Sequence, residues 1–143
     1  LSALKNKDLL LTSGIQERDP TYIDDVVDAL LLAATRKVAP GSIFNISSGK
    51  GVMVRDIVTE TLTLMGNPVK PLFGAVPMRE NEIMKMSGDI SLARRELGWR
   101  PKHSLRQGLK KTINWWKRNL DFADANLADY MNREIKRAKP RGK

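Results

Sequence analysis

The sequence has 143 residues, 41% of them hydrophobic and 29% charged, which is ordinary for one globular domain or part of one. These values exclude collagen and low-complexity disorder, and the longest apolar run, residues 26–34, is interrupted by Asp28 and too short to cross a bilayer. The absence of cysteine excludes disulfide scaffolds, thiolate metal sites and cysteine nucleophiles, and it favours the cytoplasm.

The formal net charge of +9 comes entirely from the last third of the chain. Residues 1–99 hold twelve Lys/Arg and twelve Asp/Glu, whereas residues 100–143 hold thirteen Lys/Arg and four Asp/Glu. We therefore expect a neutral domain over residues 1–120 and a basic extension over 121–143, helical at first and then disordered. The extension is either a solvated helix face and tail or a docking element for nucleic acid or an acidic partner.

The first half of the chain predicts alternating strands and helices. Residues 7–14 are typical of a short apolar strand, and residues 18–23 are expected to be extended because Pro20 disfavours helix before it. Residues 24–37 have helical spacing, with Asp24 and Asp25 at the start. We further expect a strand over 43–46, a loop over 47–51, a helix over 54–65 that ends at Gly66, and a strand over 69–73.

The second half predicts a long loop and then helices. Residues 74–88 show no period, and long loops in compact domains are usually functional or disordered. Asp89 is expected to cap a short helix that ends at Gly98, and Ser104 with Gln107 forms a capping box for a longer helix. The order favours an α/β fold with a few short strands and about four to five helices, a small sheet of the kind that completes a larger one.

Few residues offer chemistry of their own. The only histidine, His103, lies in a basic linker and is interpreted as a surface residue. Asp24, Asp25 and Asp28 are interpreted as partners of a helix dipole rather than as metal ligands. The chain has no G-x-S-x-G, no G-x-G-x-x-G, no phosphate loop and no Tyr-x-x-x-Lys. We therefore expect no catalytic, cofactor-binding or metal-binding residue in this chain alone.

Two arginines carry more information. Arg18 follows a glycine-bearing turn, and Arg79 lies in the long loop. Guanidinium groups pair with phosphates in a bidentate manner, so two of them on separate loops would clamp a diphosphate. Glu82, three residues after Arg79, would accept hydrogen bonds from a ribose diol. The alternative is that each arginine forms an ordinary surface salt bridge.

Four blocks in order resemble the C-terminal part of the extended short-chain dehydrogenase/reductases, the NAD-dependent sugar-nucleotide epimerases and dehydratases. Residues 13–26 read SGIQERDPTYIDDV, where the family has G-x-G-x-Q-x-R-D-F/Y-x-Y-V-D-D-V. Residues 43–57 read IFNISSGKGVMVRDI, and Pro77, Arg79 and Glu82 match a P-x-R-x-x-E/D loop. Residues 89–116 read DISLARRELGWRPKHSLRQGLKKTINWW, a long and specific match.

The resemblance implies a substrate-binding lobe of a Rossmann-type enzyme, with UDP-glucose 4-epimerase as the familiar family member. It places Arg18 and Arg79 on the nucleotide diphosphate, Glu82 near the ribose and Gln16 at the mouth of the same site. Residues 89–99 are expected to be structural. Asp24, Asp25 and Asn45 match family positions too, and are interpreted as capping and turn-bonding residues.

The departures from the family concern catalysis. The glycine-rich NAD loop, the catalytic Tyr-x-x-x-Lys and the usual subunit interface belong to an N-terminal Rossmann part that this sequence lacks; with Leu1 in place of Met, we interpret the chain as a processed protein or a fragment. We therefore expect a nucleotide-sugar-binding portion of a cytoplasmic enzyme, whose NAD and possible homodimer belong to the missing part. The alternative is a non-catalytic lobe that binds nucleic acid or an acidic partner through residues 121–143.

Overall fold

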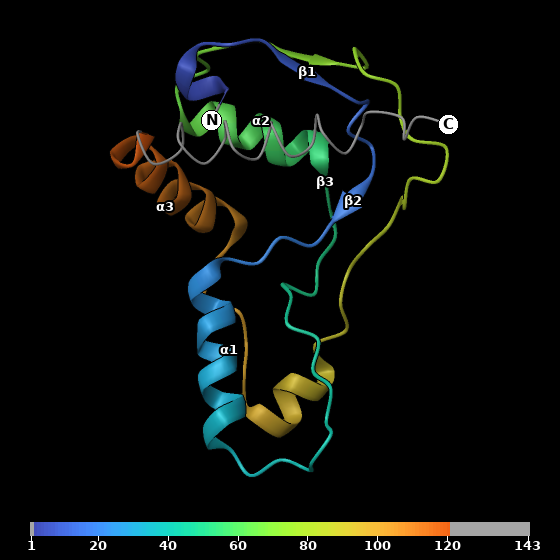
Figure 1. Cartoon of the computed structure of the whole chain (residues 1–143), viewed down its shortest axis with the longest axis vertical. Helices are drawn as coiled ribbons and strands as arrows, with labels where there is room; N and C mark the ends of the chain where they lie inside the picture. The colour runs from blue at the N-terminus through green and yellow to red at the C-terminus, as the bar shows by residue number, and fades with distance from the viewer. Residues whose placement is uncertain (1, 121–143) are drawn as a thin grey trace, which may run out of the picture.

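The computed structural model describes residues 2–120, and the expectations for residues 121–143 lie outside that range. The described part is elongated, with a strand-bearing half at the top of Figure 1 and a helical half below it. Residues 2–120 form three α-helices, two short helical segments and four short strands, which confirms the expected α/β class. Within residues 2–120, no helix has the length and apolar content of a membrane span.

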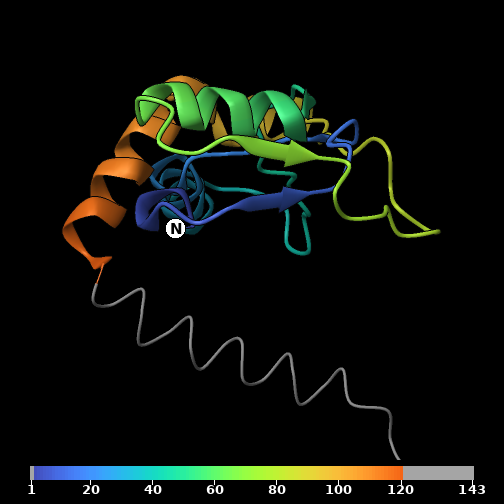
Figure 2. The ribbon, with the colours of Figure 1, turned by 90° about the horizontal axis from the view of Figure 1, so that it is seen from above.

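The upper half is a pair of two-stranded sheets covered by helices. Strand β1 (Leu9–Leu11) follows the 3-10 turn η1 (Ala3–Lys5) and pairs in parallel with β4 (Pro71–Phe73). Strand β2 (Glu17–Arg18) pairs antiparallel with β3 (Val52–Met53). Figure 2 shows helix α2 lying along the β1–β4 pair.

Helix α2 (Val54–Leu64) follows β3 directly, and its start is fixed by the chain before β2. The Val54 N–H donates to the Gln16 carbonyl (2.9 Å) and the Arg55 N–H to the Gly14 carbonyl (2.8 Å). These bonds satisfy donors that a helix N-terminus otherwise leaves unpaired. A Cβ at Gly14 would lie 2.9 Å from the Cβ of Arg55, so this close approach requires glycine.

The lower half packs helix α1 (Ile23–Thr35) against the short helix η2 (Ala93–Leu97). The core consists of five buried residues: Ala29, Ile90, Ala93, Leu97 and Trp99. Helix η2 has the wide π geometry, and Gly98 ends it with a φ of +69°. The Trp99 N–H then donates to the Ala93 carbonyl over 3.2 Å, which turns the chain back toward α1.

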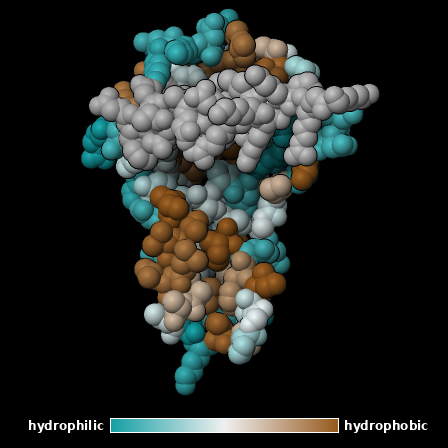
Figure 3. All heavy atoms as spheres, in the orientation of Figure 1, coloured by the Kyte–Doolittle hydropathy of each residue, from teal (hydrophilic) through white to brown (hydrophobic). Residues whose placement is uncertain are grey.

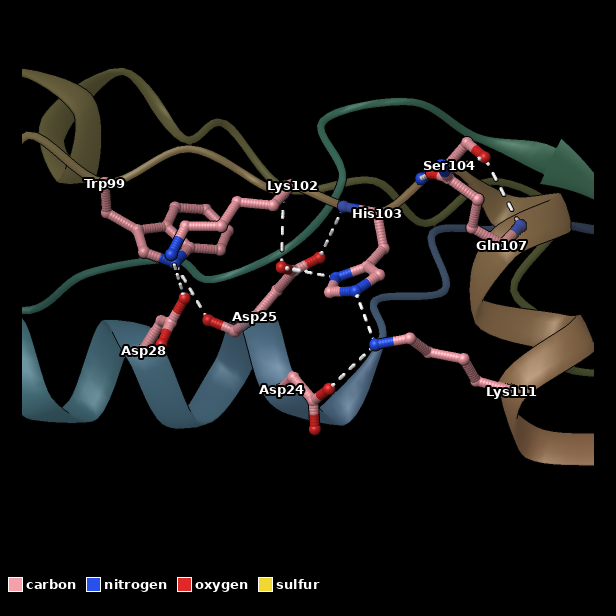
Figure 4. Close-up of polar contacts among 9 residues, drawn as sticks. All are labelled: Asp24, Asp25, Asp28, Trp99, Lys102, His103, Ser104, Gln107 and Lys111. Atoms are coloured by element: carbon pink, nitrogen blue, oxygen red, sulfur yellow. Dashed lines mark hydrogen bonds and ion pairs between the residues drawn. The ribbon is translucent and has the colours of Figure 1, made fainter. Parts of the chain in front are cut away.

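A buried carboxylate joins the two halves (Figure 4). Asp25 is 1% exposed and accepts from the backbone N–H groups of Lys102 and His103, each at 3.1 Å, and from the His103 ring at 2.9 Å. Its own backbone carbonyl accepts from the indole of Trp99 (2.8 Å). Asp25 therefore ties α1 to residues 99–103, the segment that leads into helix α3 (Leu105–Arg118).

Around this carboxylate lies a layer of more exposed contacts. The outer ring nitrogen of His103 lies 3.0 Å from the Lys111 amine, which also pairs with Asp24 at 3.3 Å. The same amine lies 5.1 Å from the centre of the Tyr22 ring, and Lys102 pairs with Asp28. These contacts attach α3 to the start of α1.

The structure corrects several expectations from the sequence. Residues 43–46 are extended but form no strand, because no backbone–backbone hydrogen bond joins them to another described segment. His103 is not a free surface residue, since its ring bonds to a buried carboxylate. Asp25 accepts from residues 102 and 103 rather than from the first turn of α1, so its interpretation as a helix cap is wrong. The Asn45 side-chain amide donates to the Asp89 carbonyl, 44 positions away in the sequence, rather than to a group within its own turn.

Other expectations hold with shorter bounds. Ser104 and Gln107 form the predicted capping box, and Gly66, with a φ of +82°, follows the end of α2. The Asp89 side chain accepts from the Ser91 N–H (2.9 Å) at the start of the turn that leads into η2. Residues 74–88 contain no helix or strand, as the aperiodic sequence predicts.

Replacing Asp25 should destabilise the chain far more than replacing its neighbour. Asp25→Ala leaves two backbone donors without an acceptor, at about 1–3 kcal/mol each, so we expect the free energy of unfolding to fall by about 2–5 kcal/mol. Asp24→Ala removes one exposed ion pair and should cost at most about 1 kcal/mol. Urea denaturation followed by tryptophan fluorescence measures both variants; equal losses would contradict the role given to Asp25.

Candidate functional site

Strand β2 brings two of the predicted site residues together. On the edge opposite β3, the Glu17 N–H donates to the Met84 carbonyl (2.7 Å), so residues 82–84 of the long loop run beside β2. The Arg18 guanidinium donates to the carbonyls of Ile83 and Glu17, both at 2.7 Å, and forms an ion pair with the Glu82 carboxylate. Residues 64 positions apart in the sequence thus meet at one edge.

The Arg18–Glu82 pair is close to the surface. The two side chains are 30% and 19% exposed. Among the described residues, the Arg18 Nε–H and its second Nη2–H make no hydrogen bond, so these donors are available to an anion from solvent. The carboxylate therefore holds the cation in place at an accessible position.

Arg79 belongs to the same loop but is free of this cluster. Its backbone carbonyl accepts from the Glu82 N–H over 3.2 Å, which forms the turn that presents Glu82 to Arg18. Its side chain is exposed and makes no hydrogen bond or ion pair with other residues in the range 2–120. The structure places Arg79 three residues from Glu82 without joining the two arginines.

Gln16 lies beneath the surface, immediately before β2. Its side-chain amide N–H is 3.4 Å from the Thr12 hydroxyl, and its side-chain carbonyl has no hydrogen-bond partner in the described structure. A buried acceptor left unpaired costs free energy, so it is a candidate to receive a donor from a bound molecule. Of the predicted site residues, Gln16 is the one with a buried side-chain atom that lacks a partner in the described structure.

Asp19 is a site-forming residue that the sequence reasoning missed. Its carboxylate accepts from the backbone N–H groups of Ser48 (2.8 Å), Gly49 (3.0 Å) and Gly88 (3.1 Å), and from the Ser48 hydroxyl. A Cβ at Gly88 would lie 2.4 Å from the Ser47 hydroxyl and 3.1 Å from the Ser47 Cβ, so the absence of a side chain at residue 88 favours the close approach of the two loops. The only sign of these loops in the sequence is the Ser-Gly pair at residues 48–49 and the second Ser-Gly pair at residues 87–88.

Two carboxylates near the site have shifted acidities. Burial tends to raise the pKa of Asp19. Hydrogen bonds from Ser48, Gly88 and Ser47 lower it by more than burial raises it, so the pKa of Asp19 lies below its ordinary value. Burial likewise tends to raise the pKa of Asp25, and the bonds from His103 and the Lys102 backbone outweigh that effect. Both groups are therefore ionised at neutral pH and stabilise the loops that carry them.

A cavity of about 720 Å³ lies on the other side of β2, between β3 and the start of α3. Glu17, Ser48, Asp56 and His103 are among its lining residues, whereas Arg18, Arg79 and Glu82 are not. Within residues 2–120, no group of three or more His, Cys, Asp or Glu has the arrangement of a metal site. The guanidinium groups of Arg18 and Arg79 therefore lie at the β2 edge and in its adjoining loop, outside this cavity.

One family model matches most of this chain. The family model described as GDP-mannose 4,6 dehydratase matches residues 2–112, more than half of the chain. The chain belongs to this family. Its matches are to about a third of nucleotide-sugar epimerases and dehydratases of the extended short-chain dehydrogenase/reductase class, as the four sequence blocks predicted.

Relatives that match this chain are described as nucleotide-sugar epimerases. A UDP-glucuronate 4-epimerase of Thermodesulfobacterium geofontis is 32% identical over 110 residues, which is 76% of this chain and 33% of the relative. A putative UDP-glucose 4-epimerase of Methanocaldococcus jannaschii is 34% identical over 122 residues, 81% of this chain and 36% of the relative. The chain thus spans about a third of the length of these relatives.

Solved structures share the fold. The UDP-glucose 4-epimerase of Thermotoga maritima, solved with UDP-glucose, has a TM-score of 0.76 and 32% identity, over 83% of this chain and 38% of that one. The Bordetella bronchiseptica enzyme WbmF, solved with NAD+ and UDP, has a TM-score of 0.76 and 31% identity, over 94% and 39%.

The residues of this chain do not fit NAD. A Rossmann site needs a glycine-rich turn between a parallel strand and a helix N-terminus. The chain has no G-x-G-x-x-G, and β1, which is in a parallel pair, leads through Gly14 into β2 rather than into a helix.

The shifted carboxylates predict acid sensitivity. A group whose pKa in the folded state is depressed stabilises the fold above its ordinary value of 3.8 and loses that contribution as the pH falls through the folded pKa. We expect thermal stability to vary little on this account down to about pH 5 and to fall steeply below pH 4. Asp19→Asn and Asp25→Asn should each flatten the acid limb of the melting-temperature profile; an unchanged limb would contradict these pKa directions.

Proposed function

We propose that this chain is the portion of a nucleotide-sugar epimerase or dehydratase that holds the nucleotide diphosphate of the substrate. The observation that carries the proposal is the meeting of Arg18 and Glu82 at the β2 edge. An oriented guanidinium with free donors at an accessible edge is the group that recognises a diphosphate. Relatives solved with UDP-glucose and with UDP support this substrate class.

Each residue has a separate role in this proposal. Arg18 binds one phosphate in an orientation set by Glu82 and by the Ile83 carbonyl. Arg79, exposed and unpaired within residues 2–120, folds over the second phosphate from the adjoining turn. Glu82 uses its second carboxylate oxygen to accept from the ribose diol, and the unpaired Gln16 carbonyl receives a further donor of the substrate.

The chemistry of the whole enzyme belongs to residues outside this chain. NAD, bound by the N-terminal Rossmann part, would supply hydride transfer in the longer protein, and a homodimer of that protein would form through the same part. What this chain contributes is position, because fixing the diphosphate holds the attached sugar in one orientation and lowers the entropic part of the barrier.

The alternative function, binding of nucleic acid or an acidic partner, would rest on residues 121–143. In the described part, the Lys102 and Lys111 amines are already paired with Asp28 and Asp24. The guanidinium at the β2 edge instead keeps donors free for an anionic ligand. We therefore favour the nucleotide-sugar proposal.

Alanine substitution of either clamp arginine should weaken nucleotide-sugar binding. Because a hydrogen bond to a charged group contributes about 1.5–3 kcal/mol, we expect Arg18→Ala and Arg79→Ala each to raise the dissociation constant by about ten-fold to a hundred-fold. Amide NMR titration of the chain with UDP-, GDP-, CDP- and dTDP-sugars at millimolar concentration measures the effect. Arg94→Ala, an exposed arginine on η2, is the matched control; affinities unchanged in both clamp variants would refute the clamp.

Glu82→Gln separates the two roles of the carboxylate. Removing its charge frees Arg18 from a competitor worth up to about 1 kcal/mol, so inorganic pyrophosphate should bind up to about five-fold more tightly. UDP should not share this gain, because its ribose loses a charged acceptor. Glu80→Gln, in the same loop, is the control. Equal changes for pyrophosphate and UDP would show that Glu82 does not contact the ribose.

A further inference from the structure

The long loop over residues 74–88 is attached to the chain around β1 and β2 at two places. Near its start, the Gly74 N–H donates to the Thr12 carbonyl over 3.2 Å, and the N–H two residues later donates to the last carbonyl of β1 over 3.0 Å. Near its end, residues 82–84 bond to β2. The backbone–backbone bonds therefore leave residues 77–81 without an attachment to β1 or β2.

One side-chain bond adds a third attachment inside this gap. The Ser13 hydroxyl donates to the Met78 sulfur over 3.0 Å, between two half-buried side chains that are 65 positions apart in the sequence. Among the described residues, no other side chain between positions 77 and 81 makes a hydrogen bond or an ion pair. The bond shortens the unattached part of the loop from five residues to three, residues 79–81.

Arg79 is the first residue after this attachment. Residues 79–81 are all exposed, and the Glu82 N–H closes them into a turn by donating to the Arg79 carbonyl over 3.2 Å. Met78 is fixed on one side of this turn, and Glu82 is fixed to Arg18 on the other. A cation on a short, fixed turn loses less entropy on binding an anion than a cation on a mobile loop.

We propose that Ser13 and Met78 are positioning residues for Arg79. Their hydrogen bond holds the turn over residues 79–81 where the Arg79 guanidinium reaches the second phosphate of the substrate. This inference rests on the proposed function, because it names the contact that prepares one half of the diphosphate clamp.

The contact belongs to this chain rather than to the motifs of its family. The pattern G-x-G-x-Q-x-R-D leaves the position of Ser13 open, and the pattern P-x-R-x-x-E/D leaves the position of Met78 open. A hydroxyl donor and a thioether acceptor therefore meet here at two positions that the motifs do not specify. A different pair of residues at these positions would leave the two motifs intact and remove the bond.

The first test is made without nucleotide, on the motion of the turn. Ser13→Ala removes the donor, and Met78→Leu removes the acceptor but keeps an apolar side chain of similar volume. Met86→Leu, at an exposed methionine of the same loop, is the matched control. We expect the backbone order parameters of residues 79–81 to fall from about 0.85 towards about 0.6 in both variants and to stay unchanged in the control.

The measurement is 15N relaxation of the 143-residue chain. Hydrophobic side chains gather over α1 in the lower half of the molecule (Figure 3), so spectra at high and at low protein concentration separate self-association from local motion. The double variant Ser13→Ala/Met78→Leu should be no more mobile than either single variant, since both substitutions remove the same bond. Order parameters that change in neither single variant, or in only one of them, would overturn the proposal.

The second test is UDP binding, followed by amide NMR titration. The affinity falls with the fraction of molecules in the binding-competent arrangement, so we expect Ser13→Ala and Met78→Leu each to raise the dissociation constant by about two-fold to five-fold. In an Arg79→Ala background neither substitution should change it further, because the side chain that they position is gone. A general structural role would weaken binding equally in both backgrounds, and that result would overturn the proposal.

The two proposals fail separately. Loss of order at residues 79–81 in the variants, in a chain whose UDP affinity does not respond to Arg79→Ala, would refute the diphosphate clamp and leave the attachment of Met78 to Ser13 standing. Unchanged order in the variants, in a chain whose UDP affinity is weakened by Arg79→Ala, would do the reverse.

Discussion

The carboxylate of Asp25 is the point on which the two halves of the molecule depend. It is buried within α1 and receives donors from residues 102 and 103. A buried charge is tolerated only when several donors satisfy it. The bonds that stabilise the carboxylate therefore also fix where residues 99–103 cross α1, and with them where α3 begins.

The same arrangement recurs at Asp19 on a smaller scale. Three backbone N–H groups, from the loops at residues 48–49 and at Gly88, converge on one carboxylate. Because Arg18 is the preceding residue, this anchoring also limits the freedom of its backbone. The guanidinium at the β2 edge thus sits beside a fixed point, and fixed donors lose less entropy on binding an anion than mobile ones.

The sequence predicts the elements better than the contacts between them. Helix α3 is predictable because its apolar stripe and its Ser104–Gln107 capping box depend only on residues close together in the sequence. The glycines at 66 and 98 end their helices through backbone conformation alone. The strand over residues 43–46 is not realised, since a ladder needs a second segment. The sequence interpretation of Asp25 and His103 is wrong because nothing in the local sequence shows that they are bonded to each other from 78 positions apart. Two adjacent aspartates and a single histidine have the same local pattern whether they are exposed or buried in such a network. Arg18 and Glu82 were singled out as site residues, but their pairing depends on the course of an aperiodic loop.

The exposed aliphatic residues of α1, which are Ile23, Val27, Leu30 and Leu31, change how the stability of this chain is understood. Each fully buried large aliphatic side chain contributes about 1.5–3 kcal/mol, and four of them on α1 contribute little of this while exposed. The core of the lower half must therefore hold α1 from one side alone. Trp99 does so together with Ile90, Ala93 and Leu97, by packing and by its indole bond to the Asp25 carbonyl. The Asp25 carboxylate adds its bonds from residues 102 and 103.

The π geometry of η2 makes its length critical. Each residue removed from or added to a helix rotates everything beyond it by about 100°. Ala93 and Leu97 both point into the core across one wide turn, and the chain reverses immediately at Gly98. A single-residue deletion between them would change the angle between the Ala93 and Leu97 side chains and shift Gly98 and Trp99 relative to α1. The five residues of η2 therefore act as a spacer that tolerates exchange of its exposed side chains far better than any change in their number.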